Sequence, residues 1–538
     1  MTPALRRGLH GALAVLVATA LVAGGCSGKG HGSSPTSTRP DATAAPSAAS
    51  GGTMRVALGG AIVVDPALAS PASPEDQMVL DLLHDGLTRL DAQGHLQPAV
   101  AESWAPDAAF RVWRFTIASA ARFTDGRPVT ATDVVASLQH VLAAGDTSLA
   151  ALRLEPVTGF RAFVDGTAPE VGGLKAVDGR TVQISLDTAL SILPEILAAP
   201  AFGIVDVASL ATAAKGDLSH LVLSGAWAVA SWTTGRLVLE RRPGTAGHLA
   251  RVELRAFADA ATAYAQLRKG AVDWAPVPTT ELGAATAAYG AGHLVPFQAE
   301  LALGVQVSAL PSVGLRQAIA AAIDRPAIVS AVYADLADAL TVVVPAGVPG
   351  TDPGRCSTCV HDPGRAKALL AAAFPTGAVP VVAIDYDASP AQQAMAKIVA
   401  QDLLAVGIPT TLRPKPLADY QRFLVSGAQA LFALSWIATD RSPDAYLDPL
   451  FRSSSPDNLV GLRSPVVDAL LAQARATADP AVQTRDWAQV EASVLDQAVV
   501  VPIAQFRTQA ATAARVSGFT QAVDGTVDWA AVSLRGAA

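Results

Sequence analysis

The chain has 538 residues, which is too long for one hydrophobic core and long enough for two or three domains. Hydrophobic residues make up 51% of the sequence, so most of it can fold. The formal net charge is −7 and no basic stripe is interleaved with aromatic residues, which argues against a nucleic-acid partner.

The N-terminus has the pattern of a targeting segment. Arg6 and Arg7 precede the apolar run Ala12–Ala23, which is too short to span a membrane as a mature helix. Small residues then lead to Cys26 in LVAGGC, which resembles a bacterial lipobox, although Ala23 stands where leucine is usual. We expect Cys26 to be lipidated and to become the first residue of the mature protein. The alternative is an ordinary secretory signal with an incidental cysteine.

We expect the signal peptide to cover residues 1–25 and a flexible tether to follow it. Residues 26–52 are rich in Gly, Ser, Thr, Pro and Ala with few charges, so they cannot bury enough apolar surface to become ordered. No later segment is predicted to cross a membrane, because the apolar stretch Leu190–Val205 is short and contains two prolines.

From residue 53 onward, strands alternate with helices. Met54–Leu58 and Arg111–Ile117 are predicted strands, whereas Glu75–Leu90 has apolar residues at helical spacing. Thr130 stands at a cap position with an acidic residue three positions later, which predicts a helix over Thr130–Leu142. Further strands are expected at Val182–Leu186, Leu237–Arg241, Val272–Trp274, Val381–Asp385, Thr410–Arg413 and Val499–Ile503. Further helices are expected at Asp259–Lys269, Gly314–Val332 with a break at Asp324-Arg325-Pro326, Asp387–Leu404, Val466–Ala476 and Ala481–Asp496. This order indicates an α/β protein with mixed sheets.

Cys356 and Cys359 are the only other cysteines. Outside the cytoplasm such a pair favours a small structural disulfide. A redox pair and half of a metal site with His361 stay open as alternatives, but neither a thioredoxin-like unit nor a fuller ligand set is visible, so no metal site is predicted.

The segment Leu434–Phe451 is the best candidate for the lining of a cleft. An apolar run leads to Trp436, and a polar turn containing Asp440 follows. An aromatic ring at a strand end beside a polar turn is typical of a binding cleft, and a core tryptophan beside an ordinary turn is the alternative. If Trp436 lines a cleft, Trp436→Ala weakens ligand binding and leaves the melting temperature of the empty protein nearly unchanged.

Enzyme motifs are absent from the sequence. It contains no GxSxG, HExxH, GxxxxGK[ST] or strand-following GxGxxG pattern, and its nine histidines are scattered. We therefore expect no enzyme activity and no cofactor; a hydrolase would need a nucleophile and a base that converge in the cleft.

Several blocks in a fixed order resemble the family 5 extracellular solute-binding proteins, the dipeptide- and oligopeptide-binding components of ABC importers. The blocks, which cover most of the chain between residues 53 and 519, are Asp65-Pro66-Ala67, His84–Trp104, Trp113–Leu138, LVLERRPG from Leu237, Arg316–Arg325, the Trp436 segment and Asp448–Ala474.

The resemblance implies a two-lobed periplasmic-binding-protein type II fold that closes on its ligand by a hinge. It places the first lobe, with an inserted subdomain, at residues 53–281 and the second lobe at 282–503. Residues 504–538 are expected to return to the first lobe.

The resemblance also implies the ligand-binding residues. Ser435, Trp436 and Ile437 align with the segment whose backbone pairs with an extended peptide. Thr439 stands where the family has an aspartate that binds the peptide amino group, and Asp440 follows it. Ser73 is expected to face the cleft, with an exposed loop residue as the alternative for both Ser73 and Asp440.

The expected protein is a monomeric receptor, lipid-anchored on the outer face of the cell membrane. It would deliver a peptide or peptide-like solute to a permease with separate ATPase subunits. The alternative is a structural or regulatory lipoprotein that keeps the scaffold without transport, because fold does not fix function.

Overall fold

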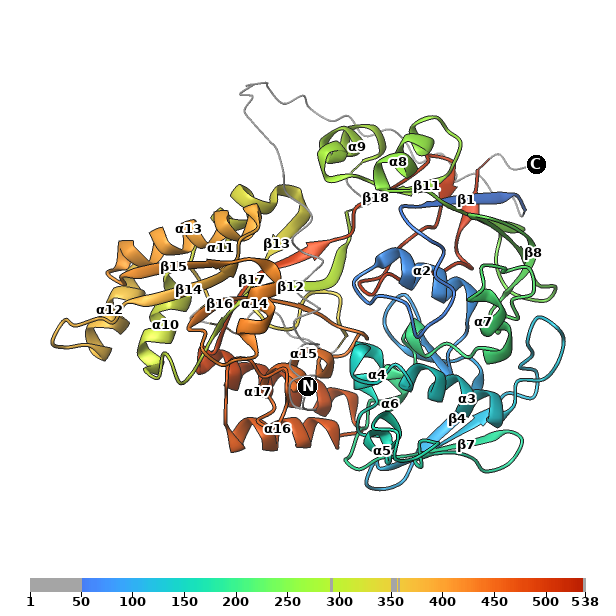
Figure 1. The fold of residues 1–538 in the computed structure, drawn as a ribbon, viewed down its shortest axis with the longest axis horizontal. Helices are drawn as coiled ribbons and strands as arrows, with labels where there is room; N and C mark the ends of the chain where they lie inside the picture. Colours follow the sequence, from blue (N-terminus) through green and yellow to red (C-terminus); the bar gives the residue numbers. More distant parts are fainter. Residues whose placement is uncertain (1–50, 291–293, 350–355, 357–358, 536–538) are drawn as a thin grey trace.

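The computed structural model describes residues 51–290, 294–349, 356 and 359–535. Two six-stranded sheets form the centres of two lobes, and a separate four-stranded sheet lies within the first lobe (Figure 1). Strands of both directions occur in each six-stranded sheet. The predicted α/β class with mixed sheets in two lobes is thus confirmed. Among the helices of the described part, none is both long enough and apolar enough to cross a bilayer.

The first six-stranded sheet is built around β1 (Thr53–Leu58), which pairs in parallel with β10 (Arg251–Ala256) and β11 (Trp274–Pro276). β9 (Arg236–Arg241) extends the sheet on one side and leads to β8. On the other side β18 (Ala510–Thr512) pairs antiparallel with β11, so the C-terminal part of the chain completes a sheet begun at the N-terminus. The remaining members of this lobe are β8 (Trp227–Thr233), β2 (Thr88–Leu90), β3 (Leu96–Pro98), β19 (Val516–Ser517), β20 (Ser533–Leu534), α2 (Pro74–Leu83), α7 (Val207–Ala213), α8 (Ala260–Arg268) and α9 (Leu282–Tyr289).

The four-stranded sheet is antiparallel and is covered by short helices. Its strands, in spatial order, are β4 (Ala101–Pro106), β5 (Val112–Ile117), β7 (Thr181–Ser185) and β6 (Leu174–Ala176). The helices that belong to it are α3 (Ala131–Leu142), α4 (Leu149–Arg153), α5 (Phe160–Val164) and α6 (Leu193–Ile196). In Figure 1, α4 lies next to α15 of the second lobe, where salt bridges join the two.

The second six-stranded sheet has β12 (Pro296–Val305) and β16 (Leu431–Ile437) near its middle. Its spatial order is β13 (Ala337–Ala339), β17 (Val500–Arg507), β12, β16, β14 (Val382–Asp387) and β15 (Thr410–Lys415). The helices around it are α10 (Val313–Ala322), α11 (Arg325–Ile328), α12 (Pro363–Ala373), α13 (Pro390–Val406), α14 (Leu417–Leu424), α15 (Asp444–Phe451), α16 (Pro465–Arg475) and α17 (Pro480–Asp496).

Helix caps agree with the sequence predictions. Thr130 and Asp133 form the expected capping box at the start of α3. Asp324 caps α11, so the predicted helix pair breaks where its Asp-Arg-Pro segment indicated. Asp259 caps α8 in the same way.

The helix predicted over Glu75–Leu90 is shorter than expected. α2 ends at Leu83, and the chain is extended at His84. A Cβ atom at Gly86 would lie 2.8 Å from the carbonyl oxygens of both Leu197 and Thr88, so the backbone approaches its neighbours too closely there for a side chain. Tertiary packing therefore overrides the apolar periodicity beyond Leu83.

Candidate functional site

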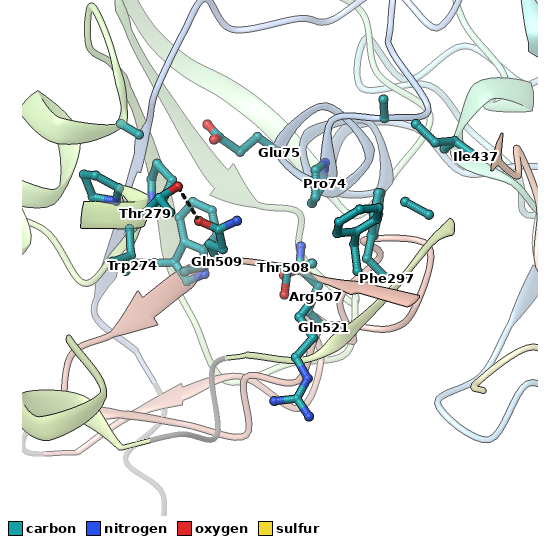
Figure 2. Close-up of a pocket in the computed structure, with 18 of the residues that line it drawn as sticks. Pro74, Glu75, Trp274, Thr279, Phe297, Ile437, Arg507, Thr508, Gln509 and Gln521 are labelled. Atoms are coloured by element: carbon teal, nitrogen blue, oxygen red, sulfur yellow. Dashed lines mark hydrogen bonds between the residues drawn. The ribbon is translucent and has the colours of Figure 1, made fainter. Parts of the chain in front are cut away.

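A cavity of about 290 Å³, the first cavity, lies between the two lobes (Figure 2). The first lobe contributes Glu75 from α2 and Trp274 from β11, and the second lobe contributes Phe297, Ser435 and Ile437. Its walls are mostly apolar with a few polar groups, which is the usual composition of a small-molecule site.

Three ionisable side chains border the first cavity: Glu75, Arg507 and Glu300, whose pKa is raised well above its ordinary value by burial. The Oε2 atom of Glu75 accepts a hydrogen bond from the backbone N–H of Gly59 at 2.7 Å, and burial raises the pKa of this carboxyl to about 7. The guanidinium of Arg507 points away from Glu75 (Figure 2) and its Nε donates to the Oδ2 atom of Asp338 at 2.7 Å. The cation of this cavity is therefore already paired within the protein.

The free backbone edge of β16 is the feature of the site that best fits an extended ligand. β14 pairs only with Leu431 and Phe432, and within the described part of the chain no strand pairs with this edge beyond them. The N–H of Ala438 donates to the carbonyl of Gln298, and the strand register then directs the N–H and C=O of Ser435 away from β12. The same alternation applies to Ile437. These two residues thus present backbone donors and acceptors on the side that β14 does not cover.

Side chains along β16 alternate between two cavities. Ser435 and Ile437 line the first cavity, and Trp436 lines a smaller one of about 80 Å³, the second cavity. Ile437 borders both cavities. Trp436 is only 5% exposed, and its Nε1 donates to the carbonyl of Ala445 at 2.9 Å.

The second cavity lies between α4 of the first lobe and the β16–α15 region of the second. Arg153 enters from α4. Its Nε donates to the Oδ2 atom of Asp440 at 2.6 Å, and its Nη1 donates to the Oδ2 atom of Asp444 at 2.8 Å. Arg475 holds the other side of Asp444, with Nε 2.6 Å from Oδ1. Arg153 therefore connects the two lobes through charge-assisted hydrogen bonds.

These residues belong to an ion cluster with three arginines and three aspartates. Arg475 and Arg452 both contact Asp448, with each N–O distance 3.0 Å. The members of the cluster are Arg153, Arg452, Arg475, Asp440, Asp444 and Asp448. Its formal charges therefore cancel.

Asp444 is the most deeply buried member, with a side chain that is 0% exposed. Burial alone raises the pKa of its carboxyl, but Arg475 and Arg153 outweigh burial and hold the pKa below its ordinary value. For Arg153, burial lowers the pKa of the guanidinium, but Asp440 and Asp444 outweigh burial and raise this pKa above its ordinary value. Asp444 and Arg153 therefore both keep their charges.

The remaining predicted site residues have local roles in the structure. Thr439 lines the second cavity, and its hydroxyl lies 3.4 Å from the Oδ2 atom of Asp440. Asp440 itself is 1% exposed and does not border either cavity. The hydroxyl of Ser73 accepts a hydrogen bond from the backbone N–H of Asp76 and caps α2, and Ser73 does not line either cavity.

The structure joins Cys356 to Cys359 by a disulfide with a Cα–Cα distance of 5.2 Å. Among the residues that the structure describes, no group of three or more His, Cys, Asp or Glu side chains could hold a metal ion. Cys26 lies outside the described residues.

Sequence reasoning missed the arginines of the cluster. Arg153 lies far from Asp440 in the sequence, and nothing in its surroundings, LRLEP, marks it. A signal did exist on the acidic side, because Asp440, Asp444 and Asp448 recur every four residues and Asp444 and Asp448 share one face of α15.

Comparisons with known proteins place this geometry in context. The model of "Bacterial extracellular solute-binding proteins, family 5 Middle" matches residues 95–458. The chain is 27% identical over 463 residues to the "Probable deoxycholate-binding periplasmic protein YgiS" of Escherichia coli K12, covering 82% of this chain and 86% of that protein. It is 25% identical over 471 residues to the periplasmic oligopeptide-binding protein OppA of the same strain, covering 83% and 86%.

The fold is similar to that of a solved binding protein. The periplasmic murein tripeptide binding protein MppA, in its unliganded open form, superposes with a TM-score of 0.81 at 22% identity. The superposition covers 91% of this chain and 99% of that structure, so both lobes take part in the similarity.

Proposed function

Because the chain belongs to the family 5 bacterial extracellular solute-binding proteins, we propose that it is a receptor that binds a peptide or peptide-like solute between its lobes. The ligand bridges the lobes and shifts an equilibrium between open and closed forms toward the closed form. The chain delivers the ligand to an ABC permease, and separate ATPase subunits supply the energy.

The observation that carries this proposal is the uncovered edge of β16 beside the first cavity. Ser435 and Ile437 offer outward backbone N–H and C=O groups, and their side chains line that cavity. An extended peptide can pair with such an edge as an added strand, which recognises main chain and tolerates many sequences. Two similar proteins, OppA and MppA, are named as binders of oligopeptides and of murein tripeptide, which agrees with this proposal.

The proposal includes a membrane anchor. Lipidation of Cys26, followed by the flexible segment to residue 52, holds the receptor on the outer face of the membrane within reach of its permease. A Cys26→Ser variant is expected in the soluble fraction of the culture, whereas the unaltered chain is expected in the membrane fraction.

Binding can be tested without knowledge of the ligand. The Cys26→Ser protein is purified, and native mass spectrometry identifies any retained solute. The protein is then unfolded, freed of solute, refolded and titrated with a pool of di- to hexapeptides. Retention of peptides together with a raised melting temperature is the expected result. Failure to retain any peptide would instead support a lipoprotein without transport activity.

A further inference from the structure

Two carboxylates buried next to the second cavity, Asp440 and Asp444, are bound by an arginine that lines it. Arg153 lines this cavity, but Asp440 and Asp444 do not. The guanidinium binds both carboxylates from the cavity side, at 2.6 and 2.8 Å. A ligand group in the cavity therefore meets the arginine before it can meet either carboxylate.

The bonds of Arg153 are costly to replace. Its side chain is 9% exposed and that of Asp440 is 1% exposed, so the pair is largely removed from water. A ligand ammonium that paired with Asp440 would displace the guanidinium of Arg153 from this carboxylate. The guanidinium would then be partly unpaired in a buried site, which is strongly unfavourable. The hydroxyl of Ser442, which donates to Asp440, further satisfies this carboxylate.

We propose that Arg153 is a built-in counter-ion for Asp440 and Asp444, so that the receptor selects ligands whose end in the second cavity carries no free ammonium. This inference rests on the proposed peptide-receptor function and names the ligand class: peptides with a blocked amino terminus, or peptide-like solutes with a neutral or anionic group at that end. Arg153 is then the specificity-determining residue of the second cavity.

Three carboxylates border the second cavity and are competing places for a cation. Asp448 is already paired with Arg452 and Arg475, each at 3.0 Å. Glu155 accepts a hydrogen bond from the Nε of Arg161 at 2.9 Å, so it already has a partner. Burial, with a smaller contribution from Glu155, raises the pKa of Asp457 to about 6. The test must therefore separate Asp457 from Asp440.

The experiment compares two peptide pools. One is an equimolar pool of tri- to pentapeptides with free amino termini, and the other is the same pool after N-acetylation. Each is equilibrated with the refolded, solute-free protein, and retained peptides are quantified by mass spectrometry. The measured quantity is the ratio of free to acetylated peptide retained by wild type, Arg153→Met, Arg153→Lys and the double variant Arg153→Met/Asp440→Asn.

Wild type is expected to retain the acetylated pool at least as well as the free pool. Arg153→Met uncovers Asp440, so the ratio should rise at least about tenfold, the size of one charge-assisted hydrogen bond. Arg153→Lys keeps the positive charge and should keep the wild-type ratio. The double variant removes the uncovered carboxylate and should return the ratio to near the wild-type value.

Other results would overturn the inference. A wild-type preference of about tenfold or more for free amino termini would do so, and loss of that preference in Asp457→Asn would locate the ammonium at Asp457. The inference would also be contradicted if Arg153→Met folds but its ratio of free to acetylated peptide does not rise above that of wild type. If Arg153→Met does not fold, the inference is still tested by two results: the ratio of free to acetylated peptide retained by wild type, and whether Arg153→Lys keeps that ratio. Retention of neither pool by wild type would refute the peptide-receptor function itself, a failure distinct from the wrong preference.

Discussion

Arg153 of α4 and Asp440, in the loop after β16, form an ion pair of 2.6 Å that joins the first lobe to the second. The pair is buried beside the second cavity, which Trp436 also lines, so the contact between the lobes and the proposed ligand recognition involve the same few residues. Changes in this region are expected to affect both stability and binding, and matched controls can separate the two effects.

Asp444→Asn should lower the free energy of unfolding by about 3–5 kcal/mol, because it leaves two buried arginines without their shared carboxylate. The measurement is urea unfolding at neutral pH. The control is Asp419→Asn, in an exposed pair with Arg422, which should change stability by less than about 0.5 kcal/mol. Equal small effects for both variants would mean that water reaches the cluster.

Ser435→Pro should weaken peptide retention by at least about tenfold, because proline removes the outward N–H of the free strand edge. Pairing with β12 should survive, since that N–H does not point toward β12. Ser435→Ala keeps the N–H and loses only the hydroxyl, so it should bind nearly as wild type does. Calorimetry with the peptide pool gives both affinities, and equal binding by the two variants would exclude strand addition at this position.

Trp436→Ala should destabilise the empty protein by about 3–5 kcal/mol, the usual range for a large buried aromatic side chain. The sequence favoured an unchanged melting temperature, whereas the structure favours a loss of stability, because the ring is 95% buried and its N–H donates to the carbonyl of Ala445. Trp436→Phe keeps much of the apolar contact and should lose less. Thermal unfolding of the solute-free protein provides the comparison, and a small loss for alanine would restore the cleft-exposed interpretation.

The contribution of His84 to stability should fall as pH decreases from about 6.5 to about 4. Burial lowers the pKa of this imidazole from 6.5 to about 4, although the carbonyl of Val64, 2.9 Å from Nε2, and Asp65 act in the opposite direction. Between about pH 6.5 and 4, His84 is protonated in the unfolded chain but remains neutral in the folded protein. Lowering the pH across this window therefore makes the His84 contribution favour unfolding. In His84→Gln the pH slope of the unfolding free energy should be smaller by on the order of 1–3 kcal/mol over the window. An unchanged slope would mean that His84 titrates normally.

Much of the fold was predictable because local signals agreed with tertiary structure. α3 was located from its Thr130 cap and apolar spacing, and the break before α11 was located from its Asp-Arg-Pro segment. β12 was not predicted, although it lies at the centre of the second sheet. Its sequence PFQAELALGV contains buried Gln298 and Glu300 and several residues with low strand propensity, so nothing in its pattern distinguishes it.

The candidate site was predictable in part. The position of Trp436 at the end of a strand, followed by a polar turn, was visible in the sequence. The partner of Asp440 was not, because Arg153 is brought to it only by packing of α4 against the second lobe. Pairings between residues so far apart in the chain follow from the assembled fold and have no local signature.

β18 has a consequence for the order in which the molecule can be completed. The chain is made from its N-terminus, but β11 receives its outer neighbour only from residues 510–512. Phe519, which packs on Trp274, and Trp529, which packs on Phe519, are made later still. A chain that emerges N-terminus first therefore exposes an open strand edge and the unpacked indole of Trp274 until residues 510–529 follow. Premature termination anywhere before β18 would leave a first lobe prone to aggregate rather than a functional half-molecule.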